Sequence, residues 1–134
     1  MNRDAVRQVR RRAGERCEYC HLPTSVYPWP FHVDHIIARQ HGGLTVLDNL
    51  ALSCLHCNRH KGPNIAGTDP RTGEVVRLFH PRNDQWSVHF EWRGPVLFGR
   101  TAIGRVTVHV LSINDPDFLA VREQLMQEQT FPLE

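Results

Sequence analysis

Two Cys-x-x-Cys pairs constrain the fold of this chain more than any other feature of its sequence. Cys17 and Cys20 form the first pair, and after a gap of 33 residues Cys54 and Cys57 form the second. A two-residue spacer lets both sulfur atoms of a pair bind one tetrahedral ion, and four thiolates complete its shell. The pattern uses every cysteine of the chain and predicts a structural zinc site. The alternative is a set of four reduced, buried thiols.

A zinc ion at this position would join two segments that are distant in the sequence. Its binding would contribute to folding directly, because a preformed site rarely exists in an unfolded chain. His56 and His60 lie four residues apart near the second cysteine pair and are competing ligands by residue type. We discount both, since four thiolates already fill the coordination shell.

Length and composition limit the class of protein. The chain has 134 residues, 40% of them hydrophobic, with nine prolines, which suits one domain with many loops. No run of 18 apolar residues is present, so we expect no membrane span. The N-terminal residues lack the apolar segment of a signal peptide. We therefore expect a cytoplasmic protein, whose paired cysteines bind metal rather than form disulfides.

Basic residues are concentrated in the first half of the chain. Residues 1–61 contain nine Lys and Arg against five Asp and Glu, whereas residues 62–134 contain seven against nine. This asymmetry points to a polyanionic partner such as DNA. Residues 3–16 are expected to form a short helix whose arginines contact phosphate. The alternative is a solvated basic face that packs Val6 and Val9 on the core.

The segment between the cysteine pairs has the pattern of a strand, a loop, a second strand and a helix. The strand, loop, second strand and helix cover residues 31–37, 38–45, 46–52 and 54–61, with a turn at Asp48-Asn49 within the second strand. Ser53 is expected to cap the helix, and Gly62 and Pro63 are expected to stop it. Tyr27 and Trp29, in the preceding proline-rich loop, are expected to pack against other residues rather than to stack on bases. The order of elements is that of a ββα unit.

The remainder of the chain is expected to be mostly strand with a final helix. Strands are predicted at residues 74–79, 86–92, 96–98 and 105–111, and a helix from Asp115-Pro116 to Gln127. The fold class is therefore α+β, with a small ββα core held by zinc, a β-strand-rich segment and a C-terminal helix. We expect residues 1–63 to form the core, with residues 64–134 packed on it as one domain.

Asp34, His35 and Asn58 have the side chains that phosphodiester hydrolysis requires. The reaction needs an activated water, a cation on the scissile phosphate and stabilisation of the leaving oxygen. A histidine titrates near neutral pH, so His35 can accept the proton of water. Asp34 can hold a hard cation, and Asn58 offers a second oxygen ligand. Such oxygen ligands suit Mg²⁺ or Mn²⁺.

The segment resembles the HNH endonuclease family, in the subtype whose zinc frame uses four cysteines. The resemblance covers residues 13–62 and rests on four runs of sequence: Asp34-His35, His41-Gly42-Gly43, Asp48-Asn49-Leu50 and Cys54-x-x-Cys57-Asn58-Arg59-x-Lys61-Gly62. The combination implies a ββα-metal fold, a DNA substrate and cleavage that leaves 5′-phosphate and 3′-hydroxyl ends.

The resemblance also implies roles for individual residues. His35 would be the general base and Asp34 a metal ligand, while Asn49 would hold the loop between the strands and help to orient His35. Asn58 stands where many members have a final histidine and would be the second metal ligand. This H-N-N variant is less suited to softer metals such as Ni²⁺ or Zn²⁺ at the catalytic position.

We therefore predict a metal-dependent DNA endonuclease with structural Zn²⁺ and catalytic Mg²⁺ or Mn²⁺. Arg59, His60 and Lys61 follow the metal ligand and are expected to bind the substrate phosphate. One alternative is a non-catalytic, zinc-stabilised module that binds nucleic acid through its arginine-rich N-terminus. Another is a protein-interaction domain whose contact surface is formed by strands within residues 74–111.

Overall fold

The computed structural model describes residues 1–26 and 28–132, and the chain divides into two compact units. The first unit contains residues 1–65 and 80–84, and the second contains residues 66–79 and those from 85 onward. Both units combine helices with two-stranded antiparallel sheets, which confirms the predicted α+β class. Within the described ranges, no helix has the length and hydrophobicity needed to cross a lipid bilayer.

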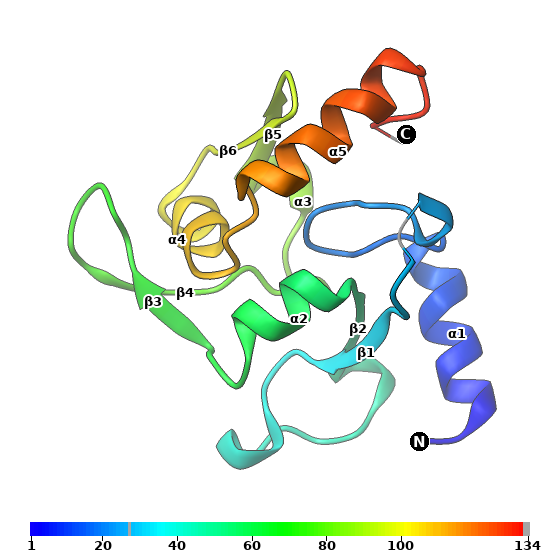
Figure 1. Ribbon diagram of the computed structural model, residues 1–134. Coiled ribbons are helices and arrows are strands. Elements are labelled where there is room, and N and C mark those ends of the chain that lie inside the picture. The colour runs from blue at the N-terminus through cyan, green and yellow to red at the C-terminus, as the bar shows by residue number, and fades with distance from the viewer. Residues whose placement is uncertain (27, 133–134) are drawn as a thin grey trace. The chain divides into compact units, whose positions relative to one another are not determined.

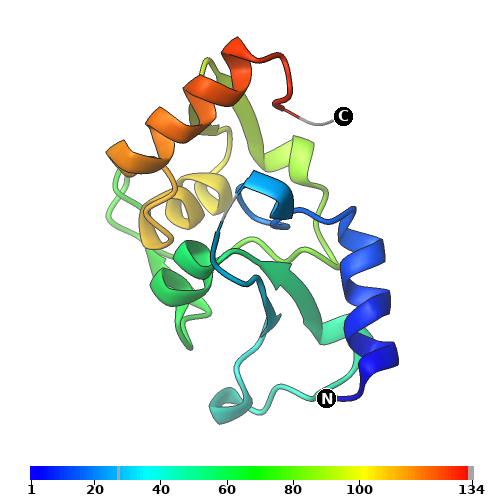
Figure 2. The ribbon, with the colours of Figure 1, turned by 45° about the vertical axis from the view of Figure 1, so that its right-hand side comes forward.

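The first unit is built from two helices and one pair of strands (Figure 1). Its elements are α1 (Arg3–Ala13), β1 (His32–His35), β2 (Leu50–Ser53) and α2 (Leu55–Lys61), with 3₁₀ turns at Thr24–Val26, Arg39–His41 and Leu47–Asn49. α2 follows β2 after a single residue, so β1, β2 and α2 form the expected ββα order. In the turned view α1 lies beside β2 (Figure 2).

Local signals at both ends determine where α1 begins and ends. The Asn2 side chain accepts a hydrogen bond from the Ala5 backbone N–H at 2.8 Å. Gly14 follows the helix in the left-handed conformation, at φ 67°, which ends the helix three residues earlier than the predicted boundary. One face of α1 places Val9 and Ala13 in a core cluster with Leu50 and Leu52 of β2.

The arginines of α1 are mostly engaged within the chain. Arg7 pairs with Asp4 at 2.9 Å, and Arg10 pairs with Glu15 at 2.6 Å. Arg12 donates to the Leu50 carbonyl oxygen at 2.6 Å, and burial lowers its pKa. These contacts favour the alternative of a packed, solvated helix over a phosphate-binding arm.

The register of the sheet determines where the Asp34-His35 pair lies. β1 and β2 are antiparallel, with Asp34 opposite Ala51 and His35 opposite Leu50. His35 is therefore the last residue of its strand, beside the turn that precedes β2. Residues 46 and 47 are not part of the return strand as we predicted, because residues 47–49 form a 3₁₀ turn that buries Asn49.

Two expectations around this core are wrong. The N-cap of α2 is Cys54 rather than Ser53: its sulfur accepts a hydrogen bond from the Cys57 N–H at 3.4 Å, and the Ser53 side chain is fully buried in β2. Trp29, which we expected to pack, is 58% exposed. Tyr27, the other aromatic residue of that loop, lies outside the described residues.

The second unit contains two strand pairs and three helices. Its elements are β3 (Ala66–Thr68), β4 (Val75–Arg77), α3 (Trp86–His89), β5 (Phe90–Arg93), β6 (Val96–Gly99), α4 (Ala102–Val110) and α5 (Pro116–Gln127). β4, β6 and α5 agree with the predicted elements. Asp115 caps α5 by accepting from the Asp117 N–H at 3.0 Å, with Pro116 in the first turn.

The strand predicted at residues 105–111 is helix α4 instead. Thr101 caps it by accepting from the Gly104 N–H at 3.1 Å. Gly104 lies so close to its neighbours that a Cβ atom there would be 2.0 Å from the His89 carbonyl oxygen. Val106 and Thr107 are fully buried on the same helix. Tertiary packing therefore overrides the β-propensity of the alternating valines.

The strand predicted at residues 86–92 is a helical turn followed by a strand. α3 ends at His89, and β5 begins at Phe90. The turn brings the Trp86 ring to 5.2 Å from the Phe90 ring and 5.8 Å from the Trp92 ring, measured between centroids. Aromatic packing favours this arrangement over an alternating strand. Of the strands expected within residues 74–111, β4, β5 and β6 are present, whereas residues 86–89 and 102–110 are helical.

Candidate zinc and nuclease centre

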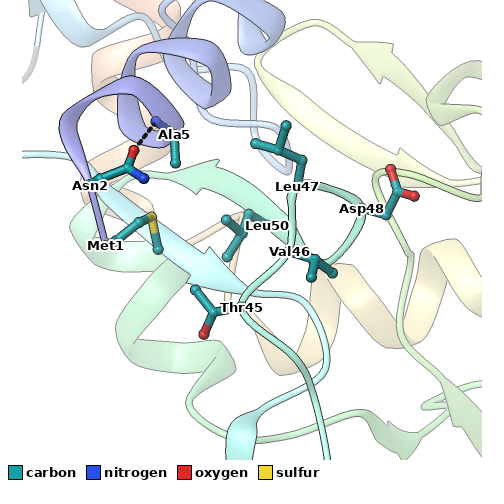
Figure 3. A pocket seen from close by; sticks show the side chains of 8 residues that line it. All are labelled: Met1, Asn2, Ala5, Thr45, Val46, Leu47, Asp48 and Leu50. Carbon is teal, nitrogen blue, oxygen red and sulfur yellow. Dashed lines mark hydrogen bonds between the residues drawn. The ribbon is translucent and has the colours of Figure 1, made fainter.

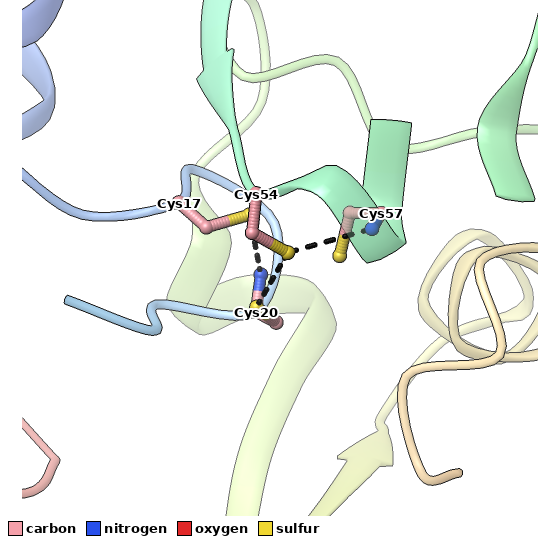
Figure 4. A group of neighbouring side chains, drawn as sticks. All are labelled: Cys17, Cys20, Cys54 and Cys57. Atoms are coloured by element: carbon pink, nitrogen blue, oxygen red, sulfur yellow. Dashed lines mark hydrogen bonds between the residues drawn. The ribbon is translucent and has the colours of Figure 1, made fainter. Parts of the chain in front are cut away.

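The four cysteines come together in the first unit (Figure 4). Cys17 and Cys20 come from the loop after α1, whereas Cys54 and Cys57 come from the start of α2. All four side chains are buried, and their sulfur atoms lie within 4.8 Å of one another. The Cys20 and Cys54 sulfurs are 3.8 Å apart. A tetrahedral ion with Zn–S bonds of ~2.3 Å holds its sulfurs ~3.8 Å apart, so the cluster fits zinc.

The charge state of these thiols also favours a bound cation. Burial raises the pKa of Cys17, but hydrogen bonds from the other three cysteines outweigh it and lower this pKa well below its usual value. Hydrogen bonds to Cys17 and Cys20, together with burial, raise the pKa of Cys57. The pKa values of Cys17 and Cys57 are therefore shifted in opposite directions. A divalent cation is what allows four thiolates to share this buried space.

The first cysteine loop is tied to the rest of the first unit. The Glu18 backbone N–H donates to the Leu52 carbonyl oxygen at 2.9 Å, and the Glu18 carboxylate accepts from the Leu52 N–H at 2.8 Å. The same carboxylate forms an ion pair with Arg82. Tyr19, fully buried, donates its hydroxyl to Asp34 Oδ2 at 3.1 Å. The zinc-binding loop therefore directly supports the side chain predicted to bind the catalytic metal.

Asp34 lies beneath the surface and next to a buried cation. Its carboxylate is 8% exposed and lies 3.0 Å from Nζ of Lys61, which is 1% exposed. Burial raises the pKa of Asp34 above its usual value, and Lys61 and Tyr19 offset this only in part. Both contacts end on Oδ2. The other carboxylate oxygen, Oδ1, is the atom suited to bind a metal ion.

Lys61 also connects α2 to the backbone of the predicted general base. Its Nζ donates to the His35 carbonyl oxygen at 3.1 Å. Because this side chain is almost fully buried, it is poorly placed for the substrate contact that we predicted for it. Arg59 and His60, which we grouped with Lys61, are exposed on the same helix. Lys61 thus supports both residues of the Asp34-His35 pair.

His35 is half-buried, and its ring contacts the loop before β2. Its Nε2 lies 2.8 Å from the Thr45 hydroxyl oxygen. If Nε2 carries the ring proton and donates it to Thr45, the other ring nitrogen, Nδ1, is free to act as a base. This is the tautomer that the predicted role requires.

Asn49 holds the loop between β1 and β2 through three hydrogen bonds. Its Oδ1 accepts from the Ile37 N–H at 2.9 Å, and its Nδ2 donates to the Ile37 and Leu44 carbonyl oxygens at 3.0 and 2.9 Å. The loop passes so closely that a Cβ atom on Gly43 would lie 1.7 Å from the Ile37 carbonyl oxygen. These contacts match the loop-holding role that the family resemblance implied for Asn49.

Asn58 lies on α2, one helical turn before Lys61. Residues three apart on a helix are neighbours on one side, and Lys61 reaches both Asp34 and the His35 carbonyl oxygen. Asn58 is half-buried, and among the described residues we find no hydrogen bond of its side-chain amide. One carboxylate and one amide oxygen are ligands that suit Mg²⁺ or Mn²⁺.

A cavity of about 570 Å³ lies between the start of α1 and the segment before β2 (Figure 3). It is lined by Met1, Asn2, Ala5, Thr45, Val46, Leu47, Asp48 and Leu50. Five of these side chains are apolar and one is a carboxylate, a lining that suits a phosphate group poorly. We therefore do not assign the substrate to this cavity.

Sequence reasoning missed three residues of this centre. Tyr19 contacts Asp34, and Thr45 contacts His35. We predicted that Lys61 binds the substrate, but it forms an ion pair with Asp34 instead. The position of Tyr19 inside a zinc-binding Cys-x-x-Cys loop could have indicated its proximity, because the metal brings this loop to β2 and α2. No local pattern marks Thr45.

Comparison with known proteins agrees with this geometry. A family model described as HNH endonuclease matches residues 17–64. No curated protein and no solved structure matched the chain. The matched segment begins at the first zinc-site cysteine and includes Asp34, His35, Asn49 and Asn58. The match confirms the resemblance seen in the sequence: residues 17–64 match the model of the HNH endonuclease family.

Proposed function

We propose that this protein is a metal-dependent DNA endonuclease. The observation that carries the proposal is the contact of Lys61 on α2 with both Asp34 and the His35 backbone on β1. It means that the helix carrying Asn58 packs against the strand that carries the acid and the base. A nuclease centre needs these groups around one phosphate.

In the proposed mechanism His35 removes a proton from water. Nε2 of His35 lies 2.8 Å from the Thr45 hydroxyl; in the proposed mechanism its N–H donates to that hydroxyl, and Nδ1 receives the proton of the attacking water. The water oxygen forms a bond to phosphorus while the bond from phosphorus to the 3′ oxygen breaks. The products carry a 5′-phosphate and, after protonation of the leaving oxygen, a 3′-hydroxyl.

Asp34 Oδ1 and the Asn58 amide oxygen would hold the Mg²⁺ or Mn²⁺ ion. When bound, such an ion offsets charge on the phosphate and the leaving oxygen. Lys61 and Tyr19 hold Oδ2 of Asp34 and so orient the carboxylate. Asn49 fixes the loop that carries Thr45 and, with it, the His35 ring. Arg59 and His60 are exposed on the same helix and are suited to bind the substrate backbone.

Nicking of a supercoiled plasmid tests the proposal. With Mg²⁺ or Mn²⁺ present, we expect the parent protein to cleave and His35→Ala to lose about 100- to 10,000-fold in rate, the usual contribution of a general base. His109→Ala is the matched control, since His109 is an exposed histidine of the second unit. Equal rates for the parent and His35→Ala would remove His35 from the mechanism.

A non-catalytic module that binds nucleic acid is the second candidate. It is favoured by the existing contacts of Asp34, whose Oδ2 is already held by Lys61 and Tyr19. This candidate predicts salt-sensitive binding of DNA, since phosphate contacts release counterions, with no cleavage in Mg²⁺, Mn²⁺ or Ca²⁺. The plasmid assay therefore separates the two candidates.

A further inference from the structure

Trp29 and one face of α2 form a hollow on the surface of the first unit. The Trp29 side chain is 58% exposed, an unusual state for so large an aromatic group. It lines a cavity of about 280 Å³ together with Leu55, His56, Arg59 and His60. The loop before β1 and α2 therefore both contribute to one concave surface.

The wall of this hollow contributed by α2 is basic. Arg59 is exposed and carries a fixed positive charge. The ring of His60 lies 4.1 Å from that of His56, between centroids, and its Nδ1 donates to the His56 carbonyl oxygen at 2.9 Å. Because Nδ1 of His60 is used in that bond, Nε2 is the ring nitrogen that remains for a ligand. An aromatic surface beside the cationic side chain of Arg59 suits a ligand that is flat, apolar on its faces and linked to an anion.

The hollow and the proposed metal ligand Asn58 belong to the same helix, α2. Arg59 directly follows Asn58, the proposed metal ligand, and is rotated from it by about 100° around the helix axis. A nucleic acid strand whose phosphate lies at Asn58 can thus continue onto the side of α2 that carries Arg59 and faces Trp29.

We propose that Trp29 stacks on an unpaired nucleobase of the DNA strand near the cleaved phosphate, while Arg59 binds the adjoining phosphate. A base presents its flat face only outside a paired duplex, and aromatic residues beside a basic groove are the usual platform for such bases. The choice of DNA as ligand rests on the proposed function. The site would direct the protein to single strands, flaps or distorted duplexes.

Binding of DNA that carries the fluorescent base 2-aminopurine tests this inference. The experiment uses the zinc-loaded His35→Ala protein without added Mg²⁺ or Mn²⁺, a single strand of about ten nucleotides and its blunt duplex. We expect 2-aminopurine emission to be quenched on the single strand and not on the duplex. Trp29→Ala should weaken single-strand binding by about 5- to 150-fold, the range measured for the loss of a stacked base.

Three further variants make the result specific. Trp29→Phe should retain most of the quenching because it keeps an aromatic face. Val75→Ala, which truncates a 78% exposed side chain of the second unit, should leave binding unchanged. Arg59→Gln should lower the slope of log K against log salt by about 0.7, the value for one phosphate contact on a single strand.

Two results would overturn the inference. One is equal quenching on single strand and duplex by the His35→Ala protein that retains Trp29. The other is unchanged single-strand affinity after Trp29→Ala. Zinc content and circular dichroism of Trp29→Ala establish whether it is folded. Quenching by the His35→Ala protein that retains Trp29 tests the site even if that variant does not fold. Because the assay requires no cleavage, it remains decisive if the protein proves not to be a nuclease.

Discussion

Lys61 is the residue whose position changes the interpretation of the site most. From the sequence it was one of three basic residues expected to contact phosphate, but its ammonium group is 1% exposed and lies 3.0 Å from Asp34. A buried ion pair is costly to break from one side, because the remaining charge loses its partner. We therefore assign Lys61 to positioning Asp34 and the His35 carbonyl oxygen rather than to the substrate.

Lys61→Met should lower the free energy of unfolding by about 3–5 kcal/mol, the usual cost of removing one partner of a buried pair. It should also slow plasmid cleavage, since the His35 carbonyl oxygen loses its donor. Urea unfolding and the nicking assay measure the two effects. The double variant Lys61→Met with Asp34→Asn should recover stability without recovering cleavage. A loss of stability below about 1 kcal/mol in Lys61→Met would show that the pair is unimportant.

At the scale of elements, the loop between β1 and β2 determines the position of His35, the proposed general base. Asn49 bonds to Ile37 and Leu44, and Gly43 lies directly against the Ile37 carbonyl oxygen. The loop carries Thr45, the partner of His35. A displacement of this loop would therefore move the ring of the proposed general base, His35, without altering any residue of the proposed site.

Gly43→Ala should reduce cleavage about 100-fold, the effect of a displacement near 1 Å at a reacting group. A Cβ atom on Gly43 would lie 1.7 Å from the Ile37 carbonyl oxygen, so the loop must move. Gly42→Ala is the matched control. Gly42 has φ +89° but open space around it, so its variant should lose about 1–2 kcal/mol of stability and keep its activity. Equal activity of the two variants would contradict this account of the loop.

The stability of the second unit should depend on pH because of Asp69. Hydrogen bonds from Arg105 and the Arg71 N–H lower the pKa of Asp69 from 3.8 to about 2. The unfolded chain therefore binds a proton that the folded unit does not, and stability falls as the pH drops from about 4 towards 2. Thermal unfolding across this range should show the loss in the parent and a smaller loss in Asp69→Asn. The same pH dependence in both proteins would exclude Asp69 as its cause.

Local signals in the sequence predicted some elements, whereas tertiary contacts determined others. α1 and α5 have caps and stop residues that are encoded within a few positions, such as Asp115 with Pro116, and both were predicted. α3 and α4 carry alternating valines or aromatic residues that indicate strand. Their helical state depends on contacts such as that of Gly104 with His89, which no local pattern encodes.

The same limit applies to the candidate site. Cysteine spacing predicted the cluster of four sulfurs, because metal geometry relates spacing directly to position. The contacts of Asp34 could not be predicted in this way. Tyr19 and Lys61 are 15 and 27 positions away in the sequence, and only folding around the cluster brings them to the carboxylate.

On the scale of the whole molecule, we expect zinc at the four-cysteine cluster to link folding of the first unit to the proposed chemistry. The cluster joins the loop after α1 to the start of α2, and Tyr19 within that loop contacts Asp34. Structural zinc sites contribute about 10–16 kcal/mol of apparent binding free energy in small domains. Loss of the metal should therefore affect the catalytic residues as well as the cysteines.

Removal of zinc by a strong chelator should abolish the slow hydrogen exchange of β1 and β2 amides, because the first unit then lacks the energy to stay folded. Cys54→Ser should have the same effect, whereas Ser53→Ala, at the neighbouring position in β2, should retain zinc and protection. Hydrogen exchange followed by mass spectrometry and a zinc assay provide the readouts. Unchanged protection in the metal-free protein would show that the cluster does not stabilise the unit.

The central claim is that α2 and β1 together hold one divalent ion and one phosphate between Asp34, His35 and Asn58. The rate of plasmid cleavage in Mn²⁺ by zinc-loaded Asn58→Ala, compared with the parent, tests it most directly. We predict cleavage by the parent and a rate at least about 100-fold lower in the variant, since a metal ligand is worth several kcal/mol in the transition state. Cleavage at the same rate by both proteins would contradict the claim.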